Sequence, residues 1–354
     1  MSSLGEGYEG ELIEKMLRGL SEKYSFELLA PRKNVLFERL SDTRVKLVPL
    51  DTEVDRNFSL RDVYIYKNYF AKEPPSILFS HSSLSSRVGA MLSGVKKLVS
   101  SKLNKRGDKA LGVMRGLYNL TTLLTVSTGD SVTMSLLDSG IDKDRIVRLP
   151  LGISAPVELS EELCPSIEEL SGRRKFEGGD YALSYVASLE ESATLFAGAM
   201  RLFPRFPFSL VVLTPSKFCL GVKHLASTLG IGSRVLVLDY NETVPEYFKS
   251  AKFFVYPSLD REEVPTLLAR FMSLGVAPIA SSTPKNKDTV KDMNSGLIFT
   301  VGDSFSLATA MEKLLLDNSL CERLASGARA RFSLLFDEEK MIRAYDDFYK
   351  ALLY

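Results

Sequence analysis

The stretch of sequence that decides the fold covers residues 253–280 and reads FFVYPSLDREEVPTLLARFMSLGVAPIA. It begins and ends with short apolar runs, at 253–256 and 277–280, which predict two strands. Neither run alternates strictly between apolar and polar residues, as expected for strands that are buried on both faces of a sheet. Between them, a loop after Pro257 and Ser258 leads into sequence of helical spacing. The stretch therefore predicts a strand–loop–helix–strand unit of a parallel α/β sheet.

The same alternation of apolar runs and helical spacing continues on both sides of this stretch. Helical spacing is clear at 307–315 and at 341–352, where apolar residues recur three or four positions apart. Two series of runs predict strands, so the fold class is α/β with doubly wound sheets. The first series covers 26–30, 45–50, 77–80, 122–127 and 146–149, and the second covers 182–187, 209–214, 235–239, 253–256, 277–280 and 297–301.

Residues 150–180 separate the two series, because they combine prolines, glycines and charges without apolar periodicity. We therefore predict a first domain at 1–150, a linker at 151–180, a second domain at 181–335 and a final helix at 336–354. A doubly wound domain normally opens with a strand, a glycine turn and a helix. Here the turn with Gly5 and Gly7 comes at once, before a helix at 11–23, so either the domain lacks its first strand or the chain is truncated at its start.

The composition excludes several classes of function. The chain has 354 residues, of which 45% are hydrophobic and 25% charged, as in soluble globular proteins. Its formal net charge of +1 gives no support for nucleic-acid binding. Three widely spaced cysteines and two histidines offer no zinc pattern and fit a reducing, cytoplasmic compartment.

The segment from residue 181 onward resembles the donor domain of the GT-B retaining glycosyltransferases of family four, which is also called group 1. The resemblance rests on Pro257-Ser258, on Glu262 in the following loop, and on the helix, glycine and strand that end the quoted stretch. It extends through Asp288 to the final helix, and upstream to residues 123–127 and 140–153. It implies two Rossmann-like domains that face each other across a cleft.

The resemblance also implies which residues form the site, and it shows where this sequence departs from the family. Glu262 matches the first acid of a pair that lies beside the donor sugar, but Arg270 stands where the second acid holds the ribose. Arginine has only hydrogen-bond donors, so it cannot replace that acceptor, although it can pair with a phosphate. After the first strand of the donor domain, the family's Arg and Lys are replaced by a segment containing Ser188, Glu190 and Glu191. These acids are expected to repel a diphosphate.

The candidate site residues follow from this comparison. Glu262 and His81 are the candidate catalytic residues, and a partly buried, hydrogen-bonded structural role is the alternative for His81. The glycines of the first turn are candidates for a phosphate loop, because backbone N–H groups at a helix N-terminus bind anions. The candidate donor-binding residues are Val264, Thr266, Arg270, Lys217, Ser188, Leu238 and Asp239, and the candidate phosphate loop contains Gly5 and Gly7.

Two functions stay open at this point. The first is an enzyme that moves a sugar from a nucleotide-sugar donor to an acceptor hydroxyl with retention, without a metal or another cofactor. Its partners would be the donor and a carbohydrate or lipid-linked acceptor, and a peripheral membrane contact is open because Lys102, Lys105, Arg106 and Lys109 form a basic cluster. The second is a catalytically degenerate GT-B protein that serves as a scaffold subunit of another glycosyltransferase. The sequence does not determine the oligomeric state.

Overall fold

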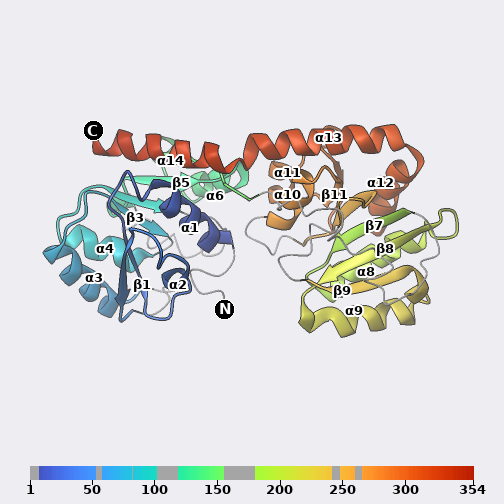
Figure 1. The fold of residues 1–354 in the computed structure, drawn as a ribbon, viewed down its shortest axis with the longest axis horizontal. Helices are drawn as coiled ribbons and strands as arrows, with labels where there is room; N and C mark the ends of the chain where they lie inside the picture. The colour runs from blue at the N-terminus through green and yellow to red at the C-terminus, as the bar shows by residue number, and fades with distance from the viewer. Residues whose placement is uncertain are drawn as a thin grey trace. The chain divides into compact units, whose positions relative to one another are not determined.

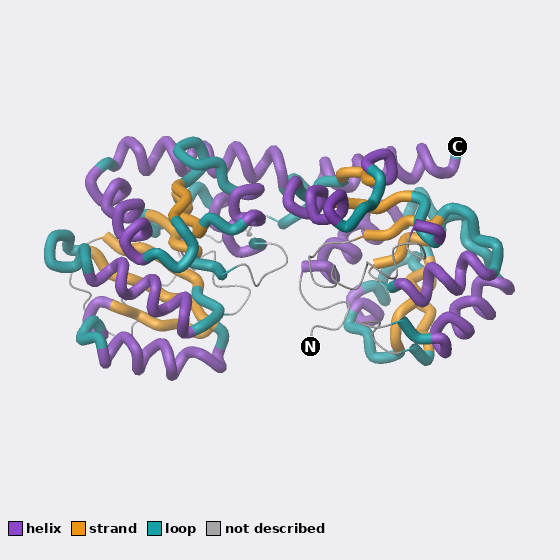
Figure 2. Tube along the Cα trace, turned by 180° about the vertical axis from the view of Figure 1, so that it is seen from behind, coloured by secondary structure: helices purple, strands orange, loops and turns teal. Residues whose placement is uncertain are grey.

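The computed structural model describes residues 8–52, 58–81, 83–101, 119–154, 180–240, 248–259 and 265–354. The chain divides into two compact units, Met1–Gly152 with Phe336–Tyr354 and Ile153–Leu335. Each unit combines parallel strands with helices (Figures 1 and 2), so the α/β class with two doubly wound parts is confirmed. Of the residues predicted as a linker, only 151–154 and 180 are described, and the predicted linker remains a prediction between them.

The first unit contains two parallel sheets among its described residues. One pairs β1 with β2, and the other has the order β3-β4-β5-β6. A cavity of about 130 Å³ lies between β1 and β3, which belong to different sheets. The strands are β1 Glu27–Pro31, β2 Lys46–Leu50, β3 Leu78–His81, β4 Leu98–Ser101, β5 Leu124–Ser127 and β6 Ile146–Arg148. The helices are α1 Tyr8–Leu20, α2 Leu36–Arg39, α3 Leu60–Lys72, α4 Leu84–Leu92, α6 Asp130–Asp138 and α14 Glu338–Leu353.

Helix α14, at the end of the chain, packs against the beginning of the chain in the first unit. The ring of Tyr349 contacts the ring of Tyr24, with centroids 5.7 Å apart. Asp346 accepts hydrogen bonds from Lys23 at 2.7 Å and from the Tyr24 hydroxyl at 2.8 Å. These donors, together with Lys350, hold the pKa of the Asp346 carboxyl well below its usual range. The contacts join segments more than 300 residues apart in the sequence.

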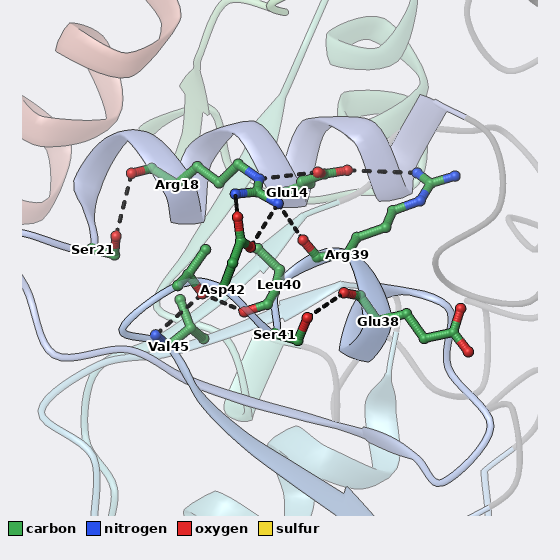
Figure 3. A network of polar contacts seen from close by, with 10 residues as sticks. Glu14, Arg18, Ser21, Glu38, Arg39, Leu40, Ser41, Asp42 and Val45 are labelled. Carbon is green, nitrogen blue, oxygen red and sulfur yellow. Dashed lines mark hydrogen bonds and ion pairs between the residues drawn. The ribbon is translucent and has the colours of Figure 1, made fainter.

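Helix α1 is also tied to the α2 region by a polar network (Figure 3). The Arg18 guanidinium donates to Glu14 at 3.1 Å and to Asp42 at 3.0 Å, and it also donates to the Arg39 carbonyl. Because the Arg18 side chain is 40% exposed, the ion pairs are screened by water and contribute little stability. The apolar face of α1, with Leu12 and Leu20 buried, is therefore the main reason why α1 stays on this unit.

The second unit is built on one parallel sheet with the order β12-β11-β10-β7-β8-β9. Strand β8 reads FSLVVLT and is buried at every position, as expected for a central strand covered by helices on both faces. The strands are β7 Asp180–Tyr185, β8 Phe208–Thr214, β9 Val235–Asp239, β10 Phe253–Tyr256, β11 Ala277–Ser281 and β12 Leu297–Phe299. The helices are α8 Leu189–Met200, α9 Ser216–Thr228, α10 Thr266–Ser273, α11 Pro284–Thr289, α12 Ser304–Leu316 and α13 Asn318–Leu335.

Gly327 in α13 marks a close approach between that helix and the loop before β12. A Cβ atom at position 327 would lie 2.0 Å from the backbone carbonyl oxygen of Asn294. Gly327→Ala is therefore expected to lower the free energy of unfolding by about 2 kcal/mol, because overpacking outweighs the better helix propensity of alanine. Urea unfolding measures the change. Gly232→Ala is the control, since its Cβ would meet Ser227 at an ordinary 3.6 Å, and equal stability of the two variants would contradict the clash.

Candidate functional site

The sheet of the second unit has one topological switch point, between β7 and β10. From β7 the chain continues to β8 and β9 on one side, and from β10 it continues to β11 and β12 on the other. Ligands of doubly wound sheets bind beyond the carboxyl ends of the strands at such a point, because the loops diverge there and leave a crevice. A binding site is therefore expected at the residues that follow Tyr185 of β7 and Tyr256 of β10.

The loop after β7 is closed by a variant of the capping box, in which the carboxylate accepts from the N–H of the residue before the N-cap. Ser188 is the N-cap of α8, and its hydroxyl accepts a hydrogen bond from the Glu191 backbone N–H at 3.2 Å. The Glu191 carboxylate reaches back and accepts from the Ala187 N–H at 2.6 Å. Glu191 is only 2% exposed, whereas Glu190 is exposed. The expectation that both acids only repel a diphosphate is therefore incomplete, because Glu191 is a buried part of the loop structure.

The loop after β10 is held from two sides. The Leu259 N–H donates to the second oxygen of Glu191 at 3.2 Å. The Ser258 carbonyl accepts from the Ser281 hydroxyl at 2.6 Å, and Asn286 donates to both oxygens of Ser281 at 3.0 Å. The main chain at 258–259 is thus connected to β11, α11 and α8. Glu262 and Val264, the next candidate residues along the chain, lie outside the described residues.

Helix α10 brings two of the predicted donor-binding residues to one face. Thr266 is its first residue, and Arg270 lies one turn later. Both side chains are half-buried, while Leu267, Leu268 and Ala269 between them are buried. Residues four apart on a helix are neighbours, so Thr266 and Arg270 form one half-exposed stripe. This arrangement agrees with their assignment to one site but does not test it.

The remaining donor-binding candidates lie at the carboxyl ends of β8 and β9. Lys217 is exposed in the first turn of α9, with its Nζ 4.9 Å from the Phe218 ring centroid. Leu238 and Asp239 are the last two residues of β9, and Asp239 accepts a hydrogen bond from the Ser216 hydroxyl. Strand β8 is paired with β7 at the switch point. Lys217 lies in the first turn of α9, the helix that follows β8. These residues share the same edge of the sheet as Ser188.

In the first unit, His81 ends β3 and borders the cavity next to β1. Its Nδ1 atom is buried and has no hydrogen-bond partner among the described residues, so both the catalytic role and the structural role of His81 remain predictions. The Glu9 carboxylate lies close by, with Oε1 at 3.8 Å from Nδ1, which is too long for a hydrogen bond. Desolvation lowers the pKa of His81 to about 4, so the ring is neutral at pH 7.

The serines that follow β3 have a structural role. Ser83 is the N-cap of α4 and accepts from the Ser86 N–H at 3.1 Å. The Ser80 hydroxyl donates to the Ser83 carbonyl at 2.8 Å. Capping of α4 by Ser83 and the hydrogen bond from Ser80 therefore give both hydroxyls a structural role. Gly5 and Gly7, the candidate phosphate loop, lie outside the described residues.

The low pKa of His81 leads to a test by pH. The folded state disfavours the charged ring, so the unfolded chain binds this proton first as the pH falls below 6.5. Stability is expected to fall by about 1.4 kcal/mol for each pH unit between 6.5 and about 4 through this group alone. Urea unfolding at several pH values should show a shallower slope for His81→Asn than for the wild type. The exposed His224 provides the control His224→Asn, and identical slopes for wild type and His81→Asn would contradict the assignment.

No described helix is long and apolar enough to cross a bilayer. Within the same residues, no group of three or more histidine, cysteine or acidic side chains is arranged to hold a metal ion.

Comparison with known proteins now adds to this geometry. The family model described as "Glycosyl transferases group 1" matches residues 216–331. These residues, the group 1 segment, are similar to that family. The group 1 segment begins at the N-terminus of α9 and ends within α13, so it contains β9 to β12 and the stripe on α10. The family resemblance drawn from the sequence is therefore confirmed.

Relatives and solved structures extend the likeness beyond the group 1 segment. The chain is 22% identical, over 93% of its length and 89% of the relative, to the UDP-Gal:alpha-D-GlcNAc-diphosphoundecaprenol alpha-1,3-galactosyltransferase of Escherichia coli. A glycosyltransferase from Rickettsia africae superposes with a TM-score of 0.82 at 16% identity, over 98% of this chain and 96% of that one. Anabaena HepE in complex with UDP and glucose gives 0.76 at 12% identity with the same coverage. The chain thus has the GT-B fold with two Rossmann-like domains.

The sequence reasoning missed one residue of this site. Glu191 connects the loops after β7 and β10, whereas the sequence suggested only a repulsive charge. The signal that could have identified it was the spacing Ser188-x-x-Glu191, which is that of a capping box.

Proposed function

We propose that the chain transfers a hexose from a uridine diphosphate sugar to a hydroxyl of a carbohydrate or lipid-linked acceptor, with retention at the transferred carbon. The observation that carries the proposal is the alignment over most of both chains with a relative named as a UDP-galactose-dependent transferase with a diphosphoundecaprenol-linked acceptor. The HepE structures with UDP and with UDP-glucose support the same donor class. A lipid-linked acceptor also favours a cytoplasmic enzyme with a peripheral membrane contact.

In the proposed reaction, the bond between the sugar's anomeric carbon and the diphosphate breaks, and a bond to the acceptor oxygen forms. The acceptor hydroxyl gives its proton to His81 or to an oxygen of the departing diphosphate, which leaves with the bonding electrons. The protein must therefore stabilise negative charge on the diphosphate and orient the acceptor. Lys217 and Arg270 are proposed to face the diphosphate, since cations stabilise that charge in a site that excludes water.

The other roles follow the sequence assignment. Glu262 is proposed to lie beside the donor sugar, and Val264 and Thr266 are proposed to contact the donor through the loop and the start of α10. His81 is neutral at pH 7, as its lowered pKa requires, so its unprotonated nitrogen is able to accept a proton or hydrogen bond from an acceptor hydroxyl. Ser188, Leu238 and Asp239 complete the proposed donor side, and Gly5 and Gly7 the proposed phosphate loop.

A specific observation favours the second function, a catalytically degenerate scaffold subunit. Arg270 on α10 stands, by the sequence resemblance, at the position where the family has a ribose-binding carboxylate, and a guanidinium accepts no hydrogen bond from ribose hydroxyls. A protein that has lost donor binding would tolerate this change.

A binding screen by thermal unfolding separates the two functions. At 100 times its dissociation constant, a ligand of the folded state adds about 2.7 kcal/mol of stability. UDP and UDP sugars are expected to raise the unfolding temperature, while guanosine diphosphate serves as the control for the base. No stabilisation by any nucleotide or nucleotide sugar would contradict the transferase and favour the scaffold.

A further inference from the structure

Glu191 connects two loops that the sheet itself does not connect. The register between β7 and β10 ends at the pair Ser184 and Val255. Beyond that pair, the segment after β7 leads to α8 and the segment after β10 leads to α10. The Glu191 carboxylate crosses the gap by accepting from the Ala187 N–H at 2.6 Å and from the Leu259 N–H at 3.2 Å. One side chain thus holds both loops at the switch point.

The burial and charge of Glu191 make this connection a strong one. The residue is 2% exposed, and each carboxylate oxygen has its own backbone donor. Hydrogen bonds to an ionised acceptor are roughly twice as strong as neutral ones, and burial removes the competition from water. The Ser188 hydroxyl accepts a hydrogen bond from the Glu191 N–H. This bond fixes the backbone position from which the Glu191 side chain extends.

The position of these hydrogen bonds at the switch point indicates their function. Doubly wound sheets bind ligands beyond the carboxyl ends of the strands at a switch point, and the two backbone N–H groups joined by Glu191, at 187 and 259, follow those strand ends. These N–H groups are engaged by the chain's own carboxylate, so the anion of a ligand must be bound by other groups. Lys217 and the stripe of Thr266 and Arg270 are such groups on the same edge of the sheet.

We infer that Glu191 is a positioning residue for the donor nucleotide: it holds the loops after β7 and β10 in the spacing that admits a nucleoside diphosphate at this switch point. The inference rests on the proposed function. Glutamine at 191 has the same shape but presents an NH₂ group to one of the two N–H groups. One hydrogen bond is therefore lost and the two loops separate.

The test measures UDP affinity by calorimetry for the wild type, Glu191→Gln and Glu191→Ala. Both variants are expected to bind UDP at least 10-fold more weakly, and Glu191→Ala more weakly than Glu191→Gln, which retains one acceptor. Amide hydrogen exchange at Leu259 is expected to accelerate in both. UDP binding as tight as that of the wild type, or tighter, would overturn the inference.

Two control variants separate positioning from charge and from stability. Glu190→Gln removes the same charge one residue away, from an exposed side chain. Asp303→Asn weakens another carboxylate that accepts from two backbone N–H groups, those of Phe305 and Ser306 at the start of α12 in the same unit. Asp303→Asn is expected to keep UDP affinity within two-fold of the wild type, even where it lowers the unfolding temperature as much as Glu191→Gln does. Glu190→Gln is expected to bind UDP no more weakly than the wild type, because it removes only a repulsive charge. If Asp303→Asn lost as much UDP affinity as Glu191→Gln, lower stability of the unit would explain both losses, and the inference would be overturned.

A failure of the proposed function gives a different pattern. A wild-type chain that does not bind UDP at millimolar concentration contradicts the uridine donor, and with it the nucleotide role of Glu191. Unchanged exchange at Leu259 in Glu191→Gln, beside wild-type binding of UDP, overturns the positioning role and leaves the proposed function intact.

Discussion

Glu262→Ala is expected to lower turnover at least 100-fold, which corresponds to about 2.7 kcal/mol of lost transition-state stabilisation. The expected reason is that Glu262 is the proposed acid beside the donor sugar, where charge develops as the bond to the diphosphate breaks. The measurement is turnover with the UDP sugar that stabilises the protein most. Circular dichroism and the unfolding temperature should stay close to those of the wild type.

The control for Glu262 is its neighbour Glu263. Glu263→Ala removes an equal charge from the adjacent position and is expected to keep turnover within a few-fold of the wild type. An unchanged rate for Glu262→Ala would remove that residue from the site. A similar loss in both variants would indicate an effect of the segment's net charge rather than of one carboxylate.

Arg270→Glu is expected to weaken UDP binding by more than 100-fold. The half-buried guanidinium of Arg270 shares a face of α10 with Thr266, and with Lys217 it is one of the two proposed cations for the diphosphate. A carboxylate in its place would add repulsion to the loss of attraction. Calorimetric titration with UDP and guanosine diphosphate measures the effect.

The opposite result would identify a different role for Arg270. Glutamate at this position restores the paired acids of the family, so a variant that binds UDP more tightly would show that Arg270 is not a phosphate clamp. Arg323→Glu is the control, because it makes the same change of charge at an exposed position of α13 and should leave UDP affinity unchanged. Absence of UDP binding by both the wild type and Arg270→Glu would favour the scaffold function.

The strands were predictable because their signal is local. Each run that the sequence predicts as a strand overlaps an observed strand, for example 209–214 within β8 and 235–239 at β9. Burial on both faces requires continuous apolar runs, and such runs remain visible in the sequence without knowledge of the partners. The predicted helix at 307–315 lies within α12, and the one at 341–352 lies within α14. They were predictable because an amphipathic helix has apolar residues three or four positions apart in its own sequence.

The site was predictable only in part, for a physical reason. The edge of the sheet that carries Ser188, Lys217 and Asp239 follows from the strand order, and parallel strands place all their carboxyl ends together. The state of each side chain does not follow, because it depends on which groups from distant segments come near it. His81 is a neutral histidine because desolvation by the surrounding residues lowers the pKa of its ring to about 4.

The sequence by itself thus determined the α/β class, the described strands other than β4 at Leu98–Ser101, and the likeness to group 1 glycosyltransferases. Only the tertiary structure decided the role of Glu191. Its two backbone partners, at 187 and 259, are separated by 72 positions in the sequence and meet only because β10 returns to lie beside β7. A hydrogen bond between such segments leaves no periodic trace in the sequence, since it depends on the pairing of the strands and not on local residue preferences.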